Sequence, residues 1–189
     1  MRLFIKEEVG LNKEHILKML EDSIFIYPTD TVYGIGCNAL REDLVAKIRD
    51  IKQRPEQPFS IIAPSKSWIF NNCNVSRQGS KWVRKLPGPF TLVLNLKNPN
   101  AIAENVNNGF PTIGVRIPKH WFTDIISELN IPIVTTSPNI TGENIMTSLE
   151  DLDETIKMKT GYIIYEGPKK GRPSDIIDLT KIKVVRKRR

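Results

Sequence analysis

Four polar segments of this chain carry the side chains that could do chemistry, and each lies beside an apolar stretch. The first is Tyr-Pro-Thr-Asp-Thr-Val-Tyr-Gly at residues 27–34, where hydroxyls and one carboxylate follow a predicted strand. Loops at strand ends often form binding sites in α/β proteins, which is one interpretation of this segment. The other is a turn in which Asp30 bonds its own backbone, and composition alone favours neither.

The second segment, residues 52–58, places Lys52 and Arg54 two positions apart. A lysine offers a compact positive charge and an arginine offers a planar fork of donors, a combination that suits a phosphate group. Because cations are also stabilised at the C-terminal end of any helix, this spacing by itself is weak support for a phosphate site.

The third and fourth segments combine apolar strands with polar groups that need partners. In residues 112–118, Arg116 interrupts an apolar strand, and a buried arginine requires an anion. That anion could be an internal carboxylate or a bound one, and we favour the bound one. In residues 135–142, Ser137 and Asn139 could bind phosphate oxygens or a base edge, or they could form a helix cap or a turn.

Positive charge is concentrated in two regions of the 189-residue chain, whose net charge is +7. Residues 57–103 contain six Lys or Arg residues and no Asp or Glu, and residues 181–189 form a basic C-terminal end. Concentrated positive charge predicts a polyanionic partner, which could be a nucleotide, a nucleic acid or both. Solubilising charge is the competing explanation, and it is stronger for the C-terminal end than for the long stretch without acids.

Composition excludes several classes of protein. No apolar run reaches the length of about 18 residues that a membrane span needs, and charges interrupt the N-terminus too early for a signal peptide, so we expect a cytoplasmic protein with no membrane contact. Cys37 and Cys73 are too few for a disulfide framework and fit buried thiols in a reducing compartment. Two histidines and two cysteines give no zinc-type cluster, so we expect no metal site, and the usual phosphate-binding loop motif is absent.

The periodicity of apolar residues predicts alternating strands and helices that must position the four segments. Helices are expected at 12–22, 42–53, 76–86, 119–129 and 148–159. Strands are expected at 2–6, 23–27, 59–63, 90–96, 112–117, 131–135, 161–165, 175–179 and 183–185. This alternation predicts one α/β (α+β) domain over residues 1–189, with a twisted mixed sheet flanked by helices.

Taken together, the four segments resemble signature motifs of the YrdC-like family, the threonylcarbamoyl-AMP synthases. The matching residues follow the order of the family, and they are Pro28–Gly34, Lys52–Pro55, Pro87–Thr91, Thr112–Pro118, Ser137–Gly142 and Ser174–Leu179. Each motif alone is weak, but six in order over residues 23–186 are highly specific. The length of the chain matches the single-domain form of the family, and the resemblance implies an open basic cleft.

The resemblance implies an enzyme, a nucleotidyltransferase that joins L-threonine, bicarbonate and ATP into threonylcarbamoyl-AMP, with pyrophosphate and water as the other products. ATP is then a substrate, and Mg²⁺ is expected to accompany it. A downstream threonylcarbamoyl-transferase complex would move the new group onto tRNA to form N6-threonylcarbamoyladenosine. Binding of tRNA or double-stranded RNA by the chain itself is a further expectation.

The resemblance also implies roles for individual residues. Lys52, Arg54, Ser137 and Asn139 match the nucleotide signature of the family, with Lys52 and Arg54 as the catalytic pair. Thr112 and Arg186 are expected on the nucleotide side, and Thr29, Tyr33, Arg116 and Ser174 are expected on the threonine side.

Several departures from the family pattern occur near these residues, of which those at Pro138 and Thr141 are mild. Ile62 occupies a position where many members have histidine, so one contact to threonine is expected to be lost. Asp175 replaces the usual threonine after Ser174, and residues 145–147 replace a common Ser-Pro-Thr. The four-residue nucleotide signature is intact.

Three other interpretations compete with the synthase. A non-catalytic tRNA or double-stranded RNA-binding module would explain the acid-free stretch and the basic end, although loss of catalysis should then show as changes at Lys52 or Arg54. A related domain occurs in hydrogenase-maturation carbamoyltransferases, but those chains carry further segments that 189 residues cannot hold. A purely structural α/β domain leaves the polar strand ends unexplained.

Overall fold

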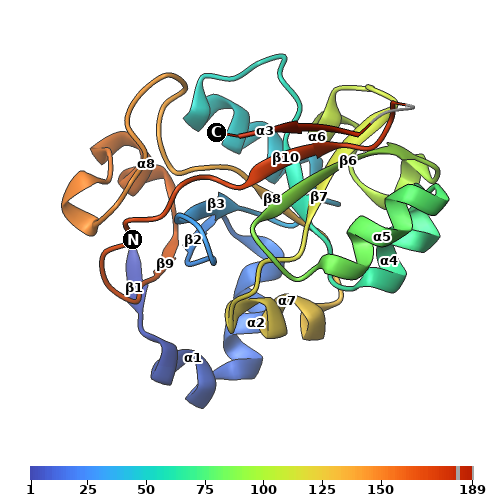
Figure 1. Cartoon of the computed structure of the whole chain (residues 1–189). Coiled ribbons are helices and arrows are strands. Elements are labelled where there is room, and N and C mark those ends of the chain that lie inside the picture. Colours follow the sequence, from blue (N-terminus) through green and yellow to red (C-terminus); the bar gives the residue numbers. More distant parts are fainter. Residues whose placement is uncertain (182–183, 189) are drawn as a thin grey trace.

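The computed structural model describes residues 1–181 and 184–188 (Figure 1). Its helices are α1 (Lys6–Leu11), α2 (Lys13–Asp22), α3 (Glu42–Lys52), α4 (Lys66–Asn72), α5 (Arg77–Lys85), α6 (Glu104–Asn107), α7 (Phe122–Leu129) and α8 (Glu154–Lys159), with 3₁₀ turns η1 (Pro99–Ala101) and η2 (Leu149–Asp151). Its strands are β1 (Arg2–Phe4), β2 (Phe25–Tyr27), β3 (Gly34–Gly36), β4 (Ser60–Ile62), β5 (Cys73–Asn74), β6 (Phe90–Leu96), β7 (Thr112–Arg116), β8 (Ile133–Thr135), β9 (Tyr162–Ile164), β10 (Asp175–Asp178) and β11 (Val185–Lys187).

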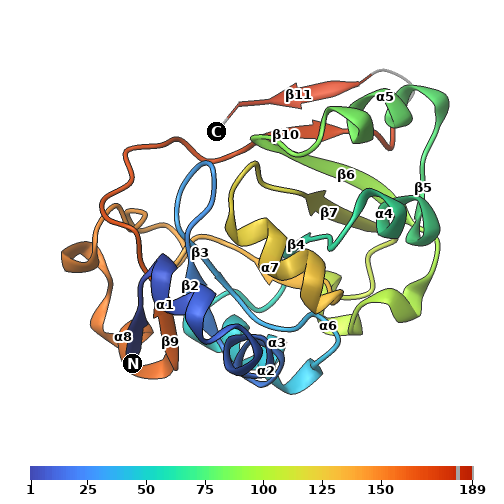
Figure 2. The same ribbon diagram turned by 90° about the horizontal axis from the view of Figure 1, so that it is seen from below.

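Two mixed sheets form the centre of the molecule, where the alternation of elements predicts one (Figure 2). The smaller sheet has the strand order β1-β9-β2-β3, and the larger has the order β11-β10-β6-β7-β4-β8, with β5 paired to β6. Parallel and antiparallel pairs occur in both sheets, as predicted for a mixed α/β fold. A backbone bridge between Ile35 and Thr136 joins the sheets and brings the loop after β2 close to the loop after β8.

Two apolar cores hold the helices against the sheets. The larger core contains buried residues of α3, α4, α5, α6 and α8, packed on the strands of both sheets. The smaller core contains buried residues of α1, α2 and α7 together with Phe25, Tyr27 and Ile62. Helices α2 and α7 accordingly lie near each other below the sheets in Figure 1. Each fully buried aliphatic side chain stabilises such a core by about 1.5–3 kcal/mol.

Helix α3 determines where Lys52 is placed. Leu44, Ile48 and Ile51 recur at helical spacing and are buried in the larger core, which fixes the rotation of the helix. Gln53 ends the helix in the left-handed conformation, with φ of 48°, and its N–H bonds the carbonyl groups of the last turn. Lys52 is therefore the last helical residue, and its side chain leaves a rigid element.

Most predicted elements are confirmed within a few residues. The helix predicted at 148–159 is divided into η2 and α8, because the Asp153 side chain accepts hydrogen bonds from Thr155 N and Ile156 N and so starts a new helix. Helix α4 is an addition, and its signal was present in the sequence, since Ser65 accepts a bond from Trp68 N as an N-cap. Helices α1 and α6 and strands β3 and β5 are further additions.

The strand predicted at 183–185 includes residue 183, which lies outside the described residues, and the structure has β11 at Val185–Lys187 instead. The predicted buried thiols are confirmed, because Cys37 and Cys73 are both free and buried. Within the described ranges, no helix combines the length and the apolar character that crossing a bilayer requires.

Candidate active site

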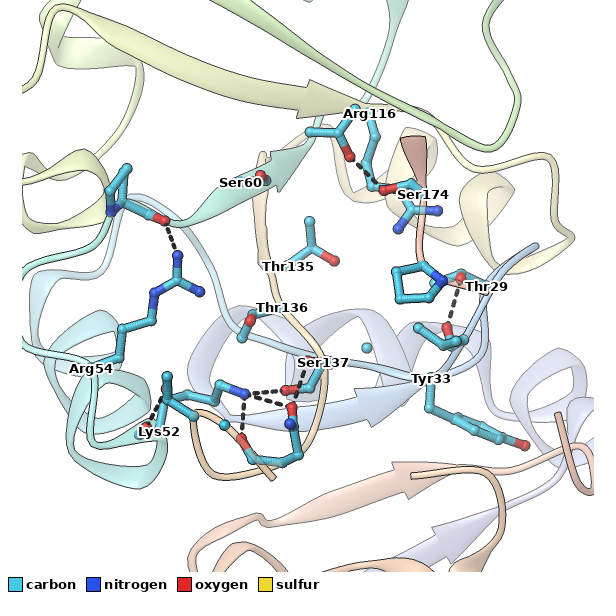
Figure 3. A pocket seen from close by; sticks show the side chains of 18 residues that line it. Thr29, Tyr33, Lys52, Arg54, Ser60, Arg116, Thr135, Thr136, Ser137 and Ser174 are labelled. Carbon is cyan, nitrogen blue, oxygen red and sulfur yellow. Dashed lines mark hydrogen bonds between the residues drawn. The ribbon is translucent and has the colours of Figure 1, made fainter. Parts of the chain in front are cut away.

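Each of the four polar segments contributes to one cleft between loops of the two sheets, and the third contributes Arg116 alone (Figure 3). Eight of the ten predicted site residues line it: Thr29, Tyr33, Lys52, Arg54, Arg116, Ser137, Asn139 and Ser174. The other lining residues are Val32, Gly34, Pro58, Ser60, Thr91, Thr135, Thr136, Thr141, Gly142 and Pro173. Among the described residues that line the cleft there is no Asp or Glu, so its charged side chains are all cations.

One face of the larger sheet forms the floor of the cleft. Strand register places Ser60 opposite both Gly114 and Thr135, so these residues share that face, and Arg116 follows on the same side of β7. Gly114 leaves room for the floor, because a Cβ at this position would lie 2.4 Å from Ser60 Oγ. The Ser60 hydroxyl was not predicted, and Thr135 was predicted only as part of the fourth polar segment. The available signal is one small polar residue at one end of each apolar strand.

Lys52 is the centre of a hydrogen-bond network at one end of the cleft. Its Nζ donates to Ser137 O at 2.6 Å, to Asn139 Oδ1 at 2.9 Å and to Asn139 O. The Ser137 hydroxyl donates to Asn139 Oδ1 at 2.5 Å, and Thr141 N and Oγ1 donate to the carbonyl oxygen of Lys52. The structure thus brings three of the four predicted nucleotide-signature side chains into direct contact.

The pKa of the Lys52 ammonium group is shifted toward neutral pH. Burial lowers the pKa of Lys52 to about 8, and the positive charge of Arg54 acts in the same direction. An incoming anion would stabilise the charged form, since an opposite charge favours ionisation. All three ammonium hydrogens already have acceptors on Ser137 and Asn139, so an incoming anion would have to replace one of these acceptors.

Arg54 lies in the loop that follows α3, two residues after Lys52. Its Nη2 donates to Pro58 O at 2.7 Å, and its guanidinium lies over the Phe59 ring at 5.2 Å from the centroid. Phe59 is buried, so this contact directs the arginine stem along a fixed surface. In Figure 3 the Arg54 side chain extends toward the Pro58 carbonyl, whereas the Lys52 side chain extends toward Ser137 and Asn139.

Arg49 shapes the loop that carries Arg54, a role that no motif indicated. It is buried in α3, and its guanidinium donates to the carbonyl oxygens of Arg54 at 2.9 Å and Gln57 at 3.1 Å. Further bonds reach the carbonyl of Asn105 at 2.8 and 2.6 Å. A planar fork can satisfy several carbonyls at once, which an ammonium group cannot do in the same geometry.

Arg116 has an internal partner at the other end of the cleft. Its Nη2 donates to Asp30 Oδ1 at 2.8 Å and to Thr31 Oγ1 at 3.1 Å, and Asp30 Oδ2 accepts from Lys119 N at 2.9 Å. The anion beside Arg116 is thus an internal carboxylate, which corrects the expectation that a bound anion is its partner. The guanidinium still lines the cleft, and its buried Nε has no hydrogen-bond partner among the described residues.

The loop after β2 contains a turn, but Thr29 closes it. Thr29 Oγ1 donates to Val32 O at 2.7 Å and accepts from Thr31 N at 3.1 Å. The interpretation in which Asp30 bonds its own backbone is therefore wrong, because the Asp30 carboxylate reaches across to β7 and its following turn. The loop therefore contains a local turn closed by Thr29 and also forms a wall of the cleft.

Tyr33 and Ser174 line the cleft, and the hydroxyl group of each has hydrogen-bond partners within the protein. Tyr33 Oη donates to Gly167 O at 2.7 Å and accepts from Glu166 N at 3.1 Å. Ser174 Oγ lies 2.7 Å from Thr91 Oγ1 on the cleft floor. Both side chains therefore tie the segment between β9 and β10 to the rest of the site.

Thr112 and Arg186 are the two predicted residues outside the lining. Thr112 shares the cleft face of β7 with Gly114, one alternate position further from the centre. Arg186 lies opposite Ile177, on the sheet face that carries Leu92 and the larger core. It donates to Asp175 through Nε at 2.9 Å and Nη2 at 2.5 Å, so the departure at Asp175 supplies its partner.

The other departures have structural explanations. Ile62 is on the cleft face of β4 but is covered by the smaller core, and it is 1 % exposed. Met146, in the replaced 145–147 segment, is buried in the larger core, and Thr147 bonds Asp151. In the described part of the chain no cluster of three His, Cys, Asp or Glu residues could hold a metal ion.

The mixed α/β fold and the carboxylate-free cleft, with Lys52 at one end and Arg116 at the other, define a protein suited to anionic substrates. The chain belongs to the Sua5/YciO/YrdC family, because the sequence profile of that family, described as telomere recombination, matches residues 18–188. This confirms the predicted family.

Individual relatives agree with this assignment. A Methanocaldococcus jannaschii protein provisionally named threonylcarbamoyl-AMP synthase is 36% identical, covering 93% of this chain and 87% of its own length. The threonylcarbamoyl-AMP synthase of Bacillus subtilis is 29% identical, covering 87% of this chain and 49% of its own. P. abyssi Sua5 in complex with L-threonine superposes with a TM-score of 0.85 at 29% identity, covering 98% of this chain and 56% of its own. The chain thus spans about half the length of the last two.

Proposed function

We propose that this chain is a nucleotidyltransferase, and specifically a threonylcarbamoyl-AMP synthase that joins L-threonine, bicarbonate and ATP. The observation that carries the proposal is the single cleft in which the Lys52 network and Arg116 lie at opposite ends (Figure 3). The names of the M. jannaschii and B. subtilis relatives and the threonine complex of the P. abyssi protein support the same activity.

Arg116 is proposed to hold the carboxylate of threonine. Asp30 and Thr31 hold its Nη2, and the guanidinium still lines the cleft. Thr29 and Ser174, which lie on the Arg116 side of the cleft in Figure 3, are proposed to complete the threonine site together with Tyr33. The threonine amine and bicarbonate combine there into a carbamate with loss of water, and one carbamate oxygen becomes the nucleophile.

Lys52, Arg54, Ser137 and Asn139 are proposed to hold ATP at the other end. The carbamate oxygen attacks the α-phosphorus, the bond from that phosphorus to the bridging oxygen breaks, and pyrophosphate leaves with the negative charge. The two cations offset that charge as it develops. Alignment of two anions in one cleft can contribute about 7–11 kcal/mol to lowering the barrier.

Mg²⁺ is proposed to enter with the phosphates of ATP. Mg²⁺ prefers oxygen ligands, usually one or two carboxylates together with phosphates and waters. Because no carboxylate is found among the described lining residues, the protein itself offers hydroxyl and amide oxygens such as Ser137 Oγ. Its chemistry there would be to neutralise phosphate charge, while the residues of the chain provide the alignment.

Release of pyrophosphate from ATP tests the proposal. The measurement is made with threonine and bicarbonate each left out in turn, and with Lys52→Ala as the inactive control. Release that requires both co-substrates and is lost in the variant supports the synthase. Release that is indifferent to threonine would indicate another amine acceptor or a nucleotidase, and would contradict the proposal. Arg186→Ala and Thr112→Ala test the two predicted ATP contacts that lie outside the cleft lining, since a raised KM for ATP would support them and an unchanged KM would confine the ATP site to the cleft.

Binding of tRNA or double-stranded RNA is a second candidate function, and the exposed face of α5 favours it. Arg77, Lys81, Arg84 and Lys85 recur at helical spacing and are exposed, while Gly79 and Val83 of the same helix are buried. Among the described residues no carboxylate forms an ion pair with any of these four cations. A row of such cations suits a phosphate backbone.

A double charge reversal tests this surface. Lys81→Glu with Arg84→Glu should weaken tRNA binding at least tenfold and flatten its dependence on salt, measured between about 50 and 200 mM. Lys18→Glu with Lys157→Glu makes the same change of charge elsewhere and should have little effect. Equal losses in both double variants would contradict a specific surface. Delivery of the product to a threonylcarbamoyl-transferase complex, and a cytoplasmic location, stay predictions from the sequence.

A further inference from the structure

The segment between β9 and β10, residues 165–174, connects the smaller sheet to the larger one and is called the strap here. Figure 2 shows it passing close to the loop after β2 on the way to β10. Its last two residues, Pro173 and Ser174, line the cleft, and Ser174 bonds Thr91 on the floor. The position of the strap therefore determines how closely its end covers the cleft.

The carboxylate of Glu166 fastens the beginning of the strap. Its Oε2 accepts from Trp121 Nε1 at 2.8 Å, and its Oε1 lies 2.9 Å from His120 Nε2 and 2.5 Å from Lys169 Nζ. Burial acts to raise the pKa of Glu166, but the bonds from Lys169, Trp121 and His120 outweigh it and lower the pKa. The carboxylate is therefore ionised at neutral pH and holds three groups at once.

The strap is also joined to the loop after β2. Tyr33 Oη bonds Gly167 O and Glu166 N, and the Tyr33 and Tyr165 rings stack at 5.5 Å between centroids. Gly171 approaches Thr31 so closely that a Cβ there would lie 1.9 Å from the Thr31 carbonyl oxygen. Movement of the strap would therefore disturb the loop after β2, which forms a wall of the cleft.

The end of β7 and the turn before α7 bind both the loop after β2 and the strap. Arg116 and Lys119 N bond Asp30 of the loop after β2, while His120 and Trp121 bond Glu166 of the strap. Arg116, at the proposed carboxylate site, is thus close in the chain to His120 and Trp121, which bind Glu166 of the strap.

We propose that Glu166 is a positioning residue that keeps the strap closed over the threonine end of the cleft. Glu166 is not among the lining residues, so it acts through Tyr33 and Ser174. A closed strap keeps Ser174 within reach of the substrate and excludes water, which matters because carbamates break down quickly in water. The inference rests on the proposed synthase function for the identity of the substrate, and on contacts alone for the anchoring.

The test compares Glu166→Ala and Glu166→Gln with wild type and with Glu154→Gln. Glu154 also pairs with a lysine three residues later, at 3.1 Å, but lies in α8, so its variant matches the loss of an ion pair without touching the strap. Two quantities are measured on the full chain: the rate of trypsin cleavage after Lys169 and Lys170, and the Kd of L-threonine by calorimetry. The melting temperature of each variant shows whether it is folded.

Glu166→Ala should speed cleavage at these two strap sites and weaken threonine binding, each by about tenfold, since hydrogen bonds to a charged group are lost. Glu166→Gln keeps a hydrogen-bond acceptor for Trp121 and should lie between Glu166→Ala and wild type. Glu154→Gln should resemble wild type in both measurements. Added threonine should protect the strap of the wild type from trypsin.

Unchanged cleavage in a folded Glu166→Gln or Glu166→Ala variant would overturn the anchoring. Faster cleavage with unchanged threonine affinity would leave an anchor without a positioning role, and would overturn the proposal. If wild type neither bound threonine nor released pyrophosphate, the synthase function would fail, while the cleavage rates would still decide whether Glu166 holds the strap.

Discussion

The Lys52 ammonium group and the Asn139 side-chain amide oxygen lie 2.9 Å apart, which joins the end of α3 to the loop after β8. The two residues are 87 positions apart in the chain, so the contact depends on the packing of α3 against the larger core. It places a lysine whose pKa is lowered to about 8 in the cleft that is proposed to bind ATP. The charge of this lysine should therefore limit activity at alkaline pH.

The pH dependence of kcat/KM for ATP tests this expectation. Lys52 is charged below a pH of about 8 and becomes neutral above it. Since kcat/KM reports groups of the free enzyme, it should be level on the acidic side and fall about tenfold per pH unit on the alkaline side. Lys52→Arg stays charged, so its activity should be lower overall but lack this decline. The same alkaline decline in Lys52→Arg would assign the titration to another group.

Arg49 should matter for stability and for the placement of Arg54. Arg49→Met leaves several buried carbonyl groups without donors and should lower the free energy of unfolding by about 3 kcal/mol or more. Denaturant unfolding measures this loss, and the KM for ATP should rise in the same variant. Arg41→Met removes an exposed arginine with two carboxylate partners and should leave the unfolding midpoint nearly unchanged. Equal effects of the two variants would contradict the role of Arg49.

Gly114 should tolerate no side chain on the cleft floor. Gly114→Ala would bring a Cβ within 2.4 Å of Ser60 Oγ and should destabilise the fold by about 1–3 kcal/mol while weakening substrate binding. Adding Ser60→Ala removes the clashing oxygen and should restore part of the stability. Gly10→Ala, in α1 with no neighbouring atom within 4 Å, should be neutral or slightly stabilising by thermal melting. A Gly114→Ala protein with wild-type stability would mean that the floor can move.

Ile62 should not be replaceable by the histidine that many family members carry. Its side chain is buried in the smaller core, so Ile62→His places an imidazole among apolar groups and should cost about 2–4 kcal/mol of stability. Leu11→His, at a side chain that is 85 % exposed, provides the control. Chemical denaturation checks both variants. A gain in threonine affinity without loss of stability would show instead that this histidine can reach the cleft.

The local elements could be predicted because their causes are local. The spacing of Leu44, Ile48 and Ile51 indicates α3, and alternating apolar residues indicate β6 and β7. Strand β3 could not be predicted this way, since Gly34-Ile35-Gly36 has little strand propensity. It is a strand because its backbone pairs with β2 and bridges to Thr136. Division into two sheets depends on the same long-range pairing.

The sequence by itself determined the family and eight residues of the cleft, because motifs preserve the side-chain types that the chemistry requires. Tertiary structure decided which groups those residues face. Arg116 meets Asp30, and Arg186 meets Asp175 on the sheet face opposite the cleft, because strand register assigns each side chain to one face. Glu166 carries no motif, and its part in holding the strap follows from donors that lie more than 40 positions earlier in the chain and meet it only through folding.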